Sequence, residues 1–387
     1  MNLMKIFKVS YIKILLILCV VLGSLLGVSS CSRKAQVVVP KVSPEVLIPK
    51  TLAKKHANSA AERHLLTFIQ KKLLTKNGLY TSTVSQSGQS DLASGHDMLS
   101  ESVGMWLDYL NASKQPQAFR RFYAHAKATF DQGPQFSYRY DPTNHRQYSV
   151  NATLDDLRII KALMVYDALN HTDRYQKEAT KRFTVLAKNC IGKGQLVNYY
   201  DVAQKRAAKS GSLAYFDLQT LHYFESATAN GKKDYQQQLR VVQNGYLGDV
   251  FPLYHASFNW ERKQYSSANL NTSEALEVLL HLAEVGKFKA ASKNWLVFQV
   301  SRHALKNSYR ITGEVADDGQ SVANYALAAL IFATIGDRSH YQMAMKLVWG
   351  EQIKDKQSPI RGAVSNRKVP IAYSFNNLTA LNAAQRE

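Results

Sequence analysis

Cysteine is scarce in this 387-residue sequence, which contains only Cys19, Cys31 and Cys190. Cys19 and Cys31 belong to the N-terminal segment described below, so Cys190 stands alone in the remainder of the chain. No intramolecular disulfide is therefore expected, and a hydrophobic core must hold the fold. The 330 residues from position 58 onward are enough for a large core, and the hydrophobic content of 45% is ordinary for a globular protein.

Acidic residues are also few. Asp and Glu total 29 against 49 Lys and Arg, which gives a formal net charge of +20. A basic surface attracts anionic partners in general. Because the basic residues are scattered, and neither a zinc motif nor a recognition-helix pattern accompanies them, we do not expect nucleic-acid binding. An anionic cell wall or membrane surface explains the charge at least as well.

The sequence lacks the motifs of the common metal and nucleotide sites. Its histidines show no HExxH pattern, and neither a phosphate-binding glycine loop nor a GxSxG elbow is present. Asp317-Asp318-Gly319 resembles part of a cation loop, but the further oxygen ligands of a calcium loop do not follow it. We interpret it as the cap of a helix that begins near Gln320. No metal and no cofactor are expected.

The N-terminus has the pattern of a secretory signal. Three lysines precede an apolar run over residues 14–28, and small residues follow that run. The sequence Val-Ser-Ser-Cys at residues 28–31 resembles a bacterial lipobox. In a lipoprotein, Cys31 would become the first residue of the mature chain and would carry a diacylglycerol group.

These features predict a signal peptide over residues 1–30, a lipidated Cys31 with a tether over residues 31–57, and one domain over residues 58–387. The chain would then lie on the extracytoplasmic face of a bacterial cell membrane, held there by its lipid. The alternative is a retained transmembrane anchor, because the apolar run of 15 residues is only slightly short of the ~17 needed to span a bilayer. Both interpretations place the domain outside the cytoplasm.

Helical patterns dominate the chain from residue 58 onward, and almost nothing alternates as a strand does. About twelve helices are predicted, near residues 58–75, 98–111, 116–130, 153–170, 173–190, 213–229, 232–246, 272–286, 288–306, 320–336, 338–348 and 375–385. Short connectors imply antiparallel neighbours, whereas longer aromatic stretches at 131–151, 191–211 and 247–271 recur between helix pairs. We predict an all-α (α/α)6 barrel, or toroid, with a cleft among its longer loops. A solenoid competes with it, but no repeat of roughly 34 to 47 residues is found.

The stretch from Ser100 to Leu110, SESVGMWLDYL, places the carboxylate of Glu101 at the start of a largely apolar helix. Asp97 or Ser100 could cap this helix, and the helix dipole also favours Glu101 there. Apolar neighbours would at the same time raise the pKa of Glu101, which suits a general acid.

Three further segments follow in order, namely ATLDDL at residues 152–157, SLAYFDL at 212–218 and YSSA at 265–268. Together with SESVG at 100–104, their order and spacing resemble glycoside hydrolase family 8, with its Ser-Glu-x-x-Gly, Ala-Thr-Asp-x-Asp-Leu, Ser-Tyr-Phe-x-Pro and Tyr-Asp-Ala motifs. The resemblance covers most of the chain from about residue 60 to 345. It implies an (α/α)6 barrel and endo-acting, inverting hydrolysis of a β-1,4-linked polysaccharide such as cellulose, chitosan, xylan or a bacterial exopolysaccharide.

The resemblance also implies roles for individual acids. Inversion requires one carboxylic acid to protonate the leaving oxygen and an opposing carboxylate to activate water. By position, Glu101 resembles the general acid, and Asp156 resembles the acid that binds and distorts the sugar at the cleaved bond. Asp155 falls on a variable position of that motif and is expected to contact substrate.

The family's base is the one acid without a match. It is the Asp of Tyr-Asp-Ala, whereas Tyr265-Ser266-Ser267-Ala268 contains no carboxylate. Either a nearby acid serves, with Glu274 and Glu261 the candidates, or the base is missing. A serine hydroxyl is not basic enough to replace it.

Aromatic side chains are the second requirement of a glycan cleft, because the C–H face of a pyranose packs on a ring. Tyr215 and Trp260 are the foremost candidates, since they lie at a helix start and in a long loop. Trp106, Tyr265 and Asp217 lie in or beside the motifs and are also expected to bind substrate.

The sequence therefore predicts a lipid-anchored glycosidase that acts on a β-linked cell-surface or biofilm exopolysaccharide. Loss of the base would instead leave a non-catalytic polysaccharide-binding lipoprotein on the same scaffold. A third interpretation is another (α/α)6 enzyme, such as a polysaccharide lyase, whose basic surface would meet acidic sugars.

Overall fold

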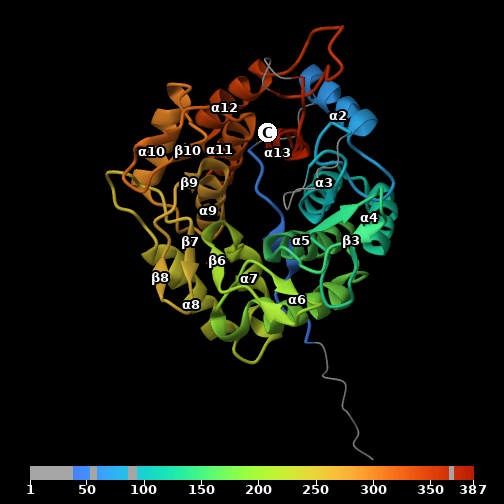
Figure 1. Ribbon diagram of the computed structural model, residues 1–387, viewed down its shortest axis with the longest axis vertical. Helices are drawn as coiled ribbons and strands as arrows, with labels where there is room; N and C mark the ends of the chain where they lie inside the picture. Colours follow the sequence, from blue (N-terminus) through green and yellow to red (C-terminus); the bar gives the residue numbers. More distant parts are fainter. Residues whose placement is uncertain (1–37, 53–58, 86–93, 366–369) are drawn as a thin grey trace, which may run out of the picture. The chain divides into compact units, whose positions relative to one another are not determined.

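Helices of the chain alternate between an inner and an outer ring (Figure 1) in the computed structural model, which describes residues 38–52, 59–85, 94–365 and 370–387. The expected signal peptide and Cys31 lie outside these ranges. Twelve α-helices occur in the described residues, so the predicted all-α (α/α)6 fold is confirmed. No helix of this part is long and apolar enough to cross a bilayer.

The inner ring consists of the helices with the largest share of buried residues. They are α3 (Ser100–Ala112), α5 (Thr153–Asn170), α7 (Leu218–Tyr223), α9 (Thr272–Glu284), α11 (Val322–Thr334) and α13 (Ser374–Ala384). α3 contacts α5, α9 contacts α11, and α13 closes the ring by contacting both α11 and α3. Between α5 and α9 the 3-10 turn η3 (Leu213–Tyr215) contacts both neighbours, and α7 continues from it.

The outer ring consists of amphipathic helices. They are α2 (Ala60–Lys72), α4 (Pro116–Phe130), α6 (Gln176–Cys190), α8 (Gly231–Asn244), α10 (Ala290–Ser301) and α12 (Arg338–Gly350). In α8, for example, the buried Tyr235, Leu239 and Val242 recur at helical spacing, so one face meets the inner ring and the other meets water. Between the two rings lies the apolar core.

Short antiparallel strands, which the sequence pattern did not reveal, lie in the loops before the inner helices. Three sheets have three strands each, and one has two. The strands are β1 (Met98–Leu99), β2 (Arg139–Asp141), β3 (Arg146–Gln147), β4 (Tyr200–Asp201), β5 (Arg206–Ala207), β6 (Ser210–Ser212), β7 (Ser257–Asn259), β8 (Gln264–Tyr265), β9 (Leu270–Asn271), β10 (Ser308–Tyr309) and β11 (Val315–Asp317). Because β1, β6 and β9 each lead into an inner element, the sheets fix where these elements begin.

Part of the expected tether belongs to the folded unit. Residues 38–52 contain the 3-10 turn η1 (Pro44–Leu47), which contacts α5 and α7, and Leu47 is fully buried. The amide of Leu52 donates to the carbonyl of Arg386, 2.8 Å away, just after α13. The boundary expected at residue 58 is therefore wrong. A short apolar sequence between prolines carries no helical period, yet it buries Leu47 against the ring.

Candidate active site

The entry to α3 is fixed by a buried ion pair. Leu99 of β1 pairs with Arg139 of β2, and the Arg139 guanidinium lies 2.7 Å from the Asp97 carboxylate, with both side chains almost fully buried. Neither Asp97 nor Ser100 caps the helix, since Leu99 occupies the N-cap position and no side chain bonds there. The capping prediction was therefore wrong, because both side chains have other partners. Glu101 remains in the first turn, with 26% of its side chain exposed.

Asp155 of α5 lies beside this helix start. The Ser100 hydroxyl donates a 2.8 Å hydrogen bond to Asp155 Oδ2, which joins α3 and α5 at their first turns. The two helices approach closely here because residue 104 is glycine. A Cβ on Gly104 would lie 2.9 Å from the Cβ of Arg158, closer than such atoms come in folded proteins.

Arg158 joins three carboxylates from three inner helices. Its guanidinium lies 3.3 Å from Glu101 and 3.6 Å from Asp155, and it also forms an ion pair with Glu277 of α9. Only 14% of the arginine side chain is exposed. The surrounding negative charge raises the pKa of Arg158 against the effect of burial, so the guanidinium stays charged.

Glu274 lies one helical turn before Glu277 on α9. The Asn271 side chain caps α9 by accepting from the Glu274 amide, and the Ser212 hydroxyl lies 3.2 Å from the Glu274 carboxylate. Glu274 is exposed to solvent, in contrast to Glu277, whose side chain is 10% exposed and held by Arg158. The structure thus brings Glu101, Asp155 and Glu274 to one end of the ring.

The carboxyl groups of Glu101, Asp155 and Glu274 have raised pKa values. Burial raises the pKa of Glu101, the charge of Arg158 opposes this, and the charges of Glu277 and Glu274 reinforce it. Burial and the charge of Glu101 raise the pKa of Asp155 to about 8. Although Glu274 as a whole residue is exposed, the protein around its carboxyl group displaces water and raises its pKa, and the charge of Glu277 raises it further. A carboxyl group with a raised pKa suits the role of a general acid.

Tyr215 of η3 faces the same cluster. Burial raises the pKa of its hydroxyl, and the charges of Asp155, Glu101 and Glu274 raise it further. The phenol therefore remains a neutral hydrogen-bond donor beside the three acids. Of the predicted aromatic platforms, Tyr215 is the one whose surroundings place it at the carboxylates.

Asp156 has a different position from the one expected. Its two carboxylate oxygens accept from the backbone amide of Phe136, at 3.0 Å, and from the side chain of Asn151, at 2.7 Å. Burial raises its pKa to about 7 even though these hydrogen bonds lower it. Asp156 therefore holds the loop before α5, and Asp155 occupies the place beside Glu101 that the motif alignment gave to Asp156. Successive helical residues differ by about 100° in direction, so only one of two adjacent acids faces the ring interior.

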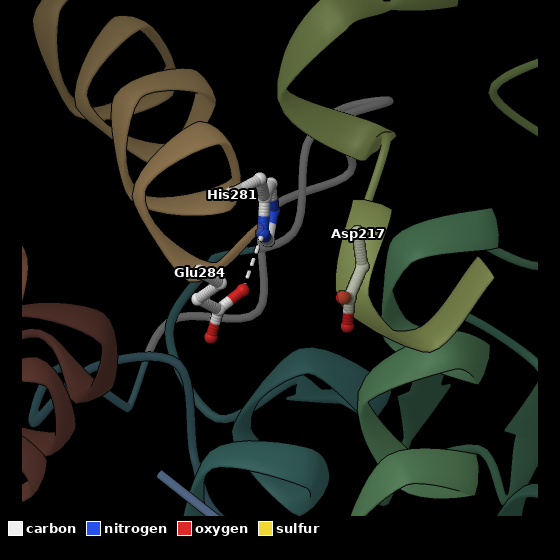
Figure 2. Close-up of side chains that lie close together, drawn as sticks. All are labelled: Asp217, His281 and Glu284. Carbon is white, nitrogen blue, oxygen red and sulfur yellow. Dashed lines mark hydrogen bonds and ion pairs between the residues drawn. The ribbon is translucent and has the colours of Figure 1, made fainter. Parts of the chain in front are cut away.

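A second charged cluster lies deeper among the inner helices (Figure 2), where Asp217, His281 and Glu284 approach within 4.8 Å of one another. These residue types could hold a metal ion. However, the Lys161 ammonium lies 3.1 Å from Glu284 and 3.7 Å from Asp217, between the two carboxylates. A divalent cation at this place would be repelled by that ammonium, so the cluster is better described as an ion-pair network.

The pKa shifts of His281 and Glu284 in this network favour their ionised states. Burial would lower the pKa of His281, but the hydrogen bond to Glu284 and the charge of Asp217 raise it. The charge of Lys161 and the bond from His281 lower the pKa of Glu284 to about 2 despite burial. Asp217 also caps α7, accepting from the amide and hydroxyl of Thr220. Its side chain is 2% exposed, so a direct contact with substrate, which was expected, is not compatible with this position.

Two of the predicted aromatic platforms, Trp106 and Tyr265, pack against other side chains of the protein. Trp106 is 3% exposed and stacks on Tyr109 in the core, so no sugar can reach its face. The Tyr265 hydroxyl donates to the carbonyl of Val241 on the outer helix α8, and the ring stacks on His255. Trp260 is partly exposed in the turn between β7 and β8, where its Nε1 donates to the carbonyl of Leu196.

Two smaller predictions concerned loops. Glu261 lies in the exposed β7–β8 turn and forms an ion pair with Lys209, both side chains being mostly in solvent. It is therefore a poor candidate for a base beside Glu101. The cap expected at Asp317-Asp318-Gly319 is supplied instead by Ser321, while Asp317 accepts from the amide of Gly319 in a local turn.

Arg158, Lys161 and Glu277 are the site residues that sequence reasoning missed. The signal was present as charged residues at helical spacing on otherwise apolar helices. Asp155, Arg158 and Lys161 recur every three residues on α5, and Glu274, Glu277, His281 and Glu284 form a similar stripe on α9. Such stripes predict one polar face on each inner helix, directed into the ring.

Comparison with known proteins gives relatives of low identity but similar length. No protein-family model matches the chain. YdaJ of Bacillus subtilis (strain 168), a provisionally assigned lipoprotein, is 23% identical over 328 residues, covering 82% of this chain and 85% of YdaJ. An α-amylase from Clostridium perfringens has a TM-score of 0.78 at 26% identity, covering 86% of this chain and 99% of the other. Endoglucanase Cel10 from Klebsiella pneumoniae, a family 8 glycosyl hydrolase, has a TM-score of 0.59 at 15% identity, covering 83% of this chain and 97% of the other.

These findings agree with the motifs and with the helix pattern. Both solved structures are named for enzymes that cleave glycosidic bonds, and nearly their whole length superposes on this chain. The likeness supports the prediction of a glycosidase. The fold implied by the resemblance to glycoside hydrolase family 8 is thereby confirmed, since the chain has the (α/α)6 fold of those enzymes.

Proposed function

We propose that the chain is an extracytoplasmic, lipid-anchored glycoside hydrolase that cleaves a polysaccharide with inversion at the anomeric carbon. The observation that carries the proposal is the convergence of Glu101, Asp155 and Glu277 on Arg158 at one end of the ring, with Glu274 one helical turn from Glu277 and close enough to act on the pKa of Glu101. A structural ion pair needs one carboxylate for each cation. Here three acids share a single guanidinium and a fourth lies one helical turn away, and such an excess of carboxyl groups, several with raised pKa values, is typical of catalytic sites.

Glu101 has the properties of the general acid. It lies in the first turn of α3 with about a quarter of its side chain exposed, so a glycosidic oxygen can reach it. Burial and the neighbouring acids raise its pKa, which keeps a proton available for the leaving group. Asp155 and Arg158 then act as positioning residues, because both contact the helix start that aims Glu101.

Glu274 has the properties of the base. Of the four acids in this cluster it is the most exposed, and it makes no ion pair among the described residues, so it can hold a water molecule. Glu277 is tied to Arg158 and Asp155 is tied to Ser100. An inverting pair requires about 6.5–9.5 Å between the two carboxyl groups, with the sugar and the water between them.

For the substrate, we propose a β-linked cell-surface or biofilm exopolysaccharide. The likeness to an α-amylase makes an α-1,4-glucan the first alternative to test. Tyr215 would bind the sugar at the cleaved bond, and the partly exposed Trp260 would pack on a sugar further along the chain.

The experiment is a reducing-end assay on the purified chain with a β-1,4-glucan, an α-1,4-glucan and bacterial exopolysaccharides. Glu101→Gln and Glu274→Gln are each expected to lower kcat by roughly 10²–10⁴-fold on the substrate that the wild type cleaves. The matched control is Glu261→Gln, which makes the same change at an exposed loop acid and should leave kcat unaltered. NMR of the first product should show the anomer opposite to that of the substrate.

The rival functions give different outcomes. Equal release of reducing ends by the wild type and Glu101→Gln would contradict the proposal of an enzyme. The chain would then be interpreted as a polysaccharide-binding protein. A product that absorbs in the ultraviolet through a new double bond would indicate a lyase. A product that retains the anomeric configuration of the substrate would contradict the assignment of Glu274 as a base, because retention requires a nucleophile closer to Glu101.

The anchor is tested separately. Likeness to YdaJ supports a lipoprotein, and Cys31 is the residue that a lipid would modify. Cys31→Ser should move the chain from the membrane fraction to the soluble extracytoplasmic fraction. A variant that stays in the membrane fraction would indicate a retained transmembrane segment instead.

A further inference from the structure

A cavity of about 680 Å³ lies on the outer side of the ring, between α2 and the segment that follows α12. Its two walls are held together by Gln352, whose side chain donates to the carbonyls of Ala61, at 2.7 Å, and of Gly362, at 3.0 Å. Gly362 has a left-handed φ of +93° and passes so close to α2 that a Cβ there would lie 2.7 Å from the carbonyl oxygen of His64. The walls of the cavity are therefore held in place by hydrogen bonds and close packing.

Five basic side chains surround this cavity. They are His64, Lys71, Lys72, Lys354 and Arg361, all of them exposed, and we refer to the cavity as the basic pocket. Among the residues that the structure describes, no acidic side chain lines the basic pocket. Elsewhere in the described residues, basic side chains such as Lys127, Arg182 and Lys293 have carboxylate partners within ion-pair distance. The basic side chains of the basic pocket have no carboxylate partner within ion-pair distance among the described residues. Their positive charges therefore repel one another until an anion enters.

The shape and lining of the basic pocket indicate the kind of anion. Its volume lies in the range of about 300–1,000 Å³ that small-molecule sites occupy, well above the needs of a single inorganic ion. Between the cations lie the apolar side chains of Phe68 and Ile353 and the hydroxyl of Thr67. An apolar patch beside charged donors suits a sugar ring that carries an acidic group. A flat lipid surface would reach only the rim of a cavity.

We propose that the basic pocket binds an acidic sugar unit, carboxylated or phosphorylated, of an anionic polysaccharide. Lys71, Lys72, Lys354 and Arg361 supply charge-assisted hydrogen bonds to the acidic group. None of the residues that line this pocket belongs to the carboxylate cluster around Arg158. The pocket is thus a second glycan site outside the cleft, and its binding does not depend on hydrolysis.

The test is calorimetric titration of the full chain in detergent micelles, in a Glu101→Gln background so that cleavage cannot interfere. The probes are tetragalacturonic acid and a glycerol phosphate oligomer, with neutral cellotetraose as the comparison. We expect at least one acidic probe to bind, and Lys71→Gln with Arg361→Gln to weaken it by about tenfold or more. Both substituted side chains are exposed, so the fold should be retained.

A matched variant separates the pocket from the overall positive charge. Lys177→Gln with Lys181→Gln removes the same two charges from the exposed face of the outer helix α6 and should leave the affinity unaltered. Equal weakening by both pairs would overturn the proposal, as would binding of cellotetraose as tightly as the acidic probes. Failure of both acidic probes to bind would overturn it too.

Phospholipid vesicles test whether the acidic group comes from a membrane surface and not from a glycan. If vesicles of phosphatidylglycerol bind in a manner that depends on Lys71 and Arg361, while neither soluble probe does, the pocket serves a membrane surface and the glycan proposal is wrong. Because Glu101 is already changed in every sample, failure of the proposed hydrolysis would leave these results unaffected.

Discussion

The guanidinium of Arg158 lies 3.3 Å from the carboxylate of Glu101, and the same guanidinium also pairs with Asp155 and Glu277. One cation therefore sets the charge state of the acid that we assign to protonating the substrate. Its charge lowers the pKa of Glu101, while burial raises it. The balance between these two effects keeps Glu101 able to both hold and release a proton.

Arg158→Met should move the pH dependence of activity toward higher pH. Without the guanidinium, burial and the charges of Glu274 and Glu277 are no longer opposed, so the pKa of Glu101 rises further. A general acid works while protonated, and the alkaline limb of kcat/KM should therefore shift upward. Since breaking a buried ion pair costs about 3–5 kcal/mol, Arg158→Lys serves as the second variant. It keeps the charge and should shift the limb less; an unmoved limb in both variants would contradict the role of Arg158.

Asp155→Asn and Asp156→Asn should have opposite effects on activity and stability. Asp156 accepts two hydrogen bonds that hold the loop before α5, and an amide can satisfy only one of them. Asp156→Asn should therefore cost about 1–3 kcal/mol of unfolding free energy and leave kcat nearly unaltered. Asp155→Asn should lower kcat on the order of 10–100-fold, because it disturbs the carboxyl beside Glu101, with little effect on unfolding. Urea unfolding and the reducing-end assay measure both, and the reverse pattern would restore the assignment based on the motif.

Most of the helical fold could be predicted because helix formation here depends on local patterns. The expected helices at 116–130 and 153–170 agree with α4 and α5 at both ends. The region 213–229 was predicted as one helix, but it is divided into η3, α7 and the 3-10 turn η4 (Phe224–Ala227). Tertiary contacts decide this division, since η3 is held between α5 and α9. The strands were missed because two or three residues cannot show a period of two.

The site could be predicted only in part, for a related reason. Motif order located the start of α3 and the start of α5, but it could not tell which of two adjacent acids faces inward. The partners of Glu101 come from α5 and α9, which lie 57 and 176 positions further along the sequence at Arg158 and Glu277. Contacts of this range follow from the closure of the ring, and no local window of sequence contains them.

Gly104→Ala should destabilise the chain although alanine is the better helix former. The new Cβ would lie 2.9 Å from the Cβ of Arg158 and 3.6 Å from the amide nitrogen of Ile159, so α5 would have to move. Overpacking costs about 1–3 kcal/mol, against a gain of about 1 kcal/mol in helix propensity. Gly350→Ala is the control, because a Cβ at this position, at the end of α12, would meet no atom within 4 Å apart from its chain neighbours and its own helix backbone. Thermal unfolding should show a Tm below that of the wild type for Gly104→Ala but not for Gly350→Ala. Equal Tm values for Gly104→Ala and the wild type would show that α3 and α5 can move apart without loss of stability.

Glu284→Gln should lower stability in a manner that depends on pH. The charge of Lys161 and the bond from His281 lower the pKa of Glu284 from 4.5 to about 2, so the folded state binds fewer protons than the unfolded state between these values. The ionised group therefore stabilises the fold above about pH 4.5, and this contribution is lost as the pH falls through about 2. It amounts to about 3 kcal/mol at most, and Glu284→Gln should lose that amount near neutral pH. The difference in urea unfolding free energy between wild type and variant should then shrink as the pH approaches 2. Exposed Glu261 provides the control, and a Glu284→Gln difference that stays constant with pH would show that the network contributes through packing alone.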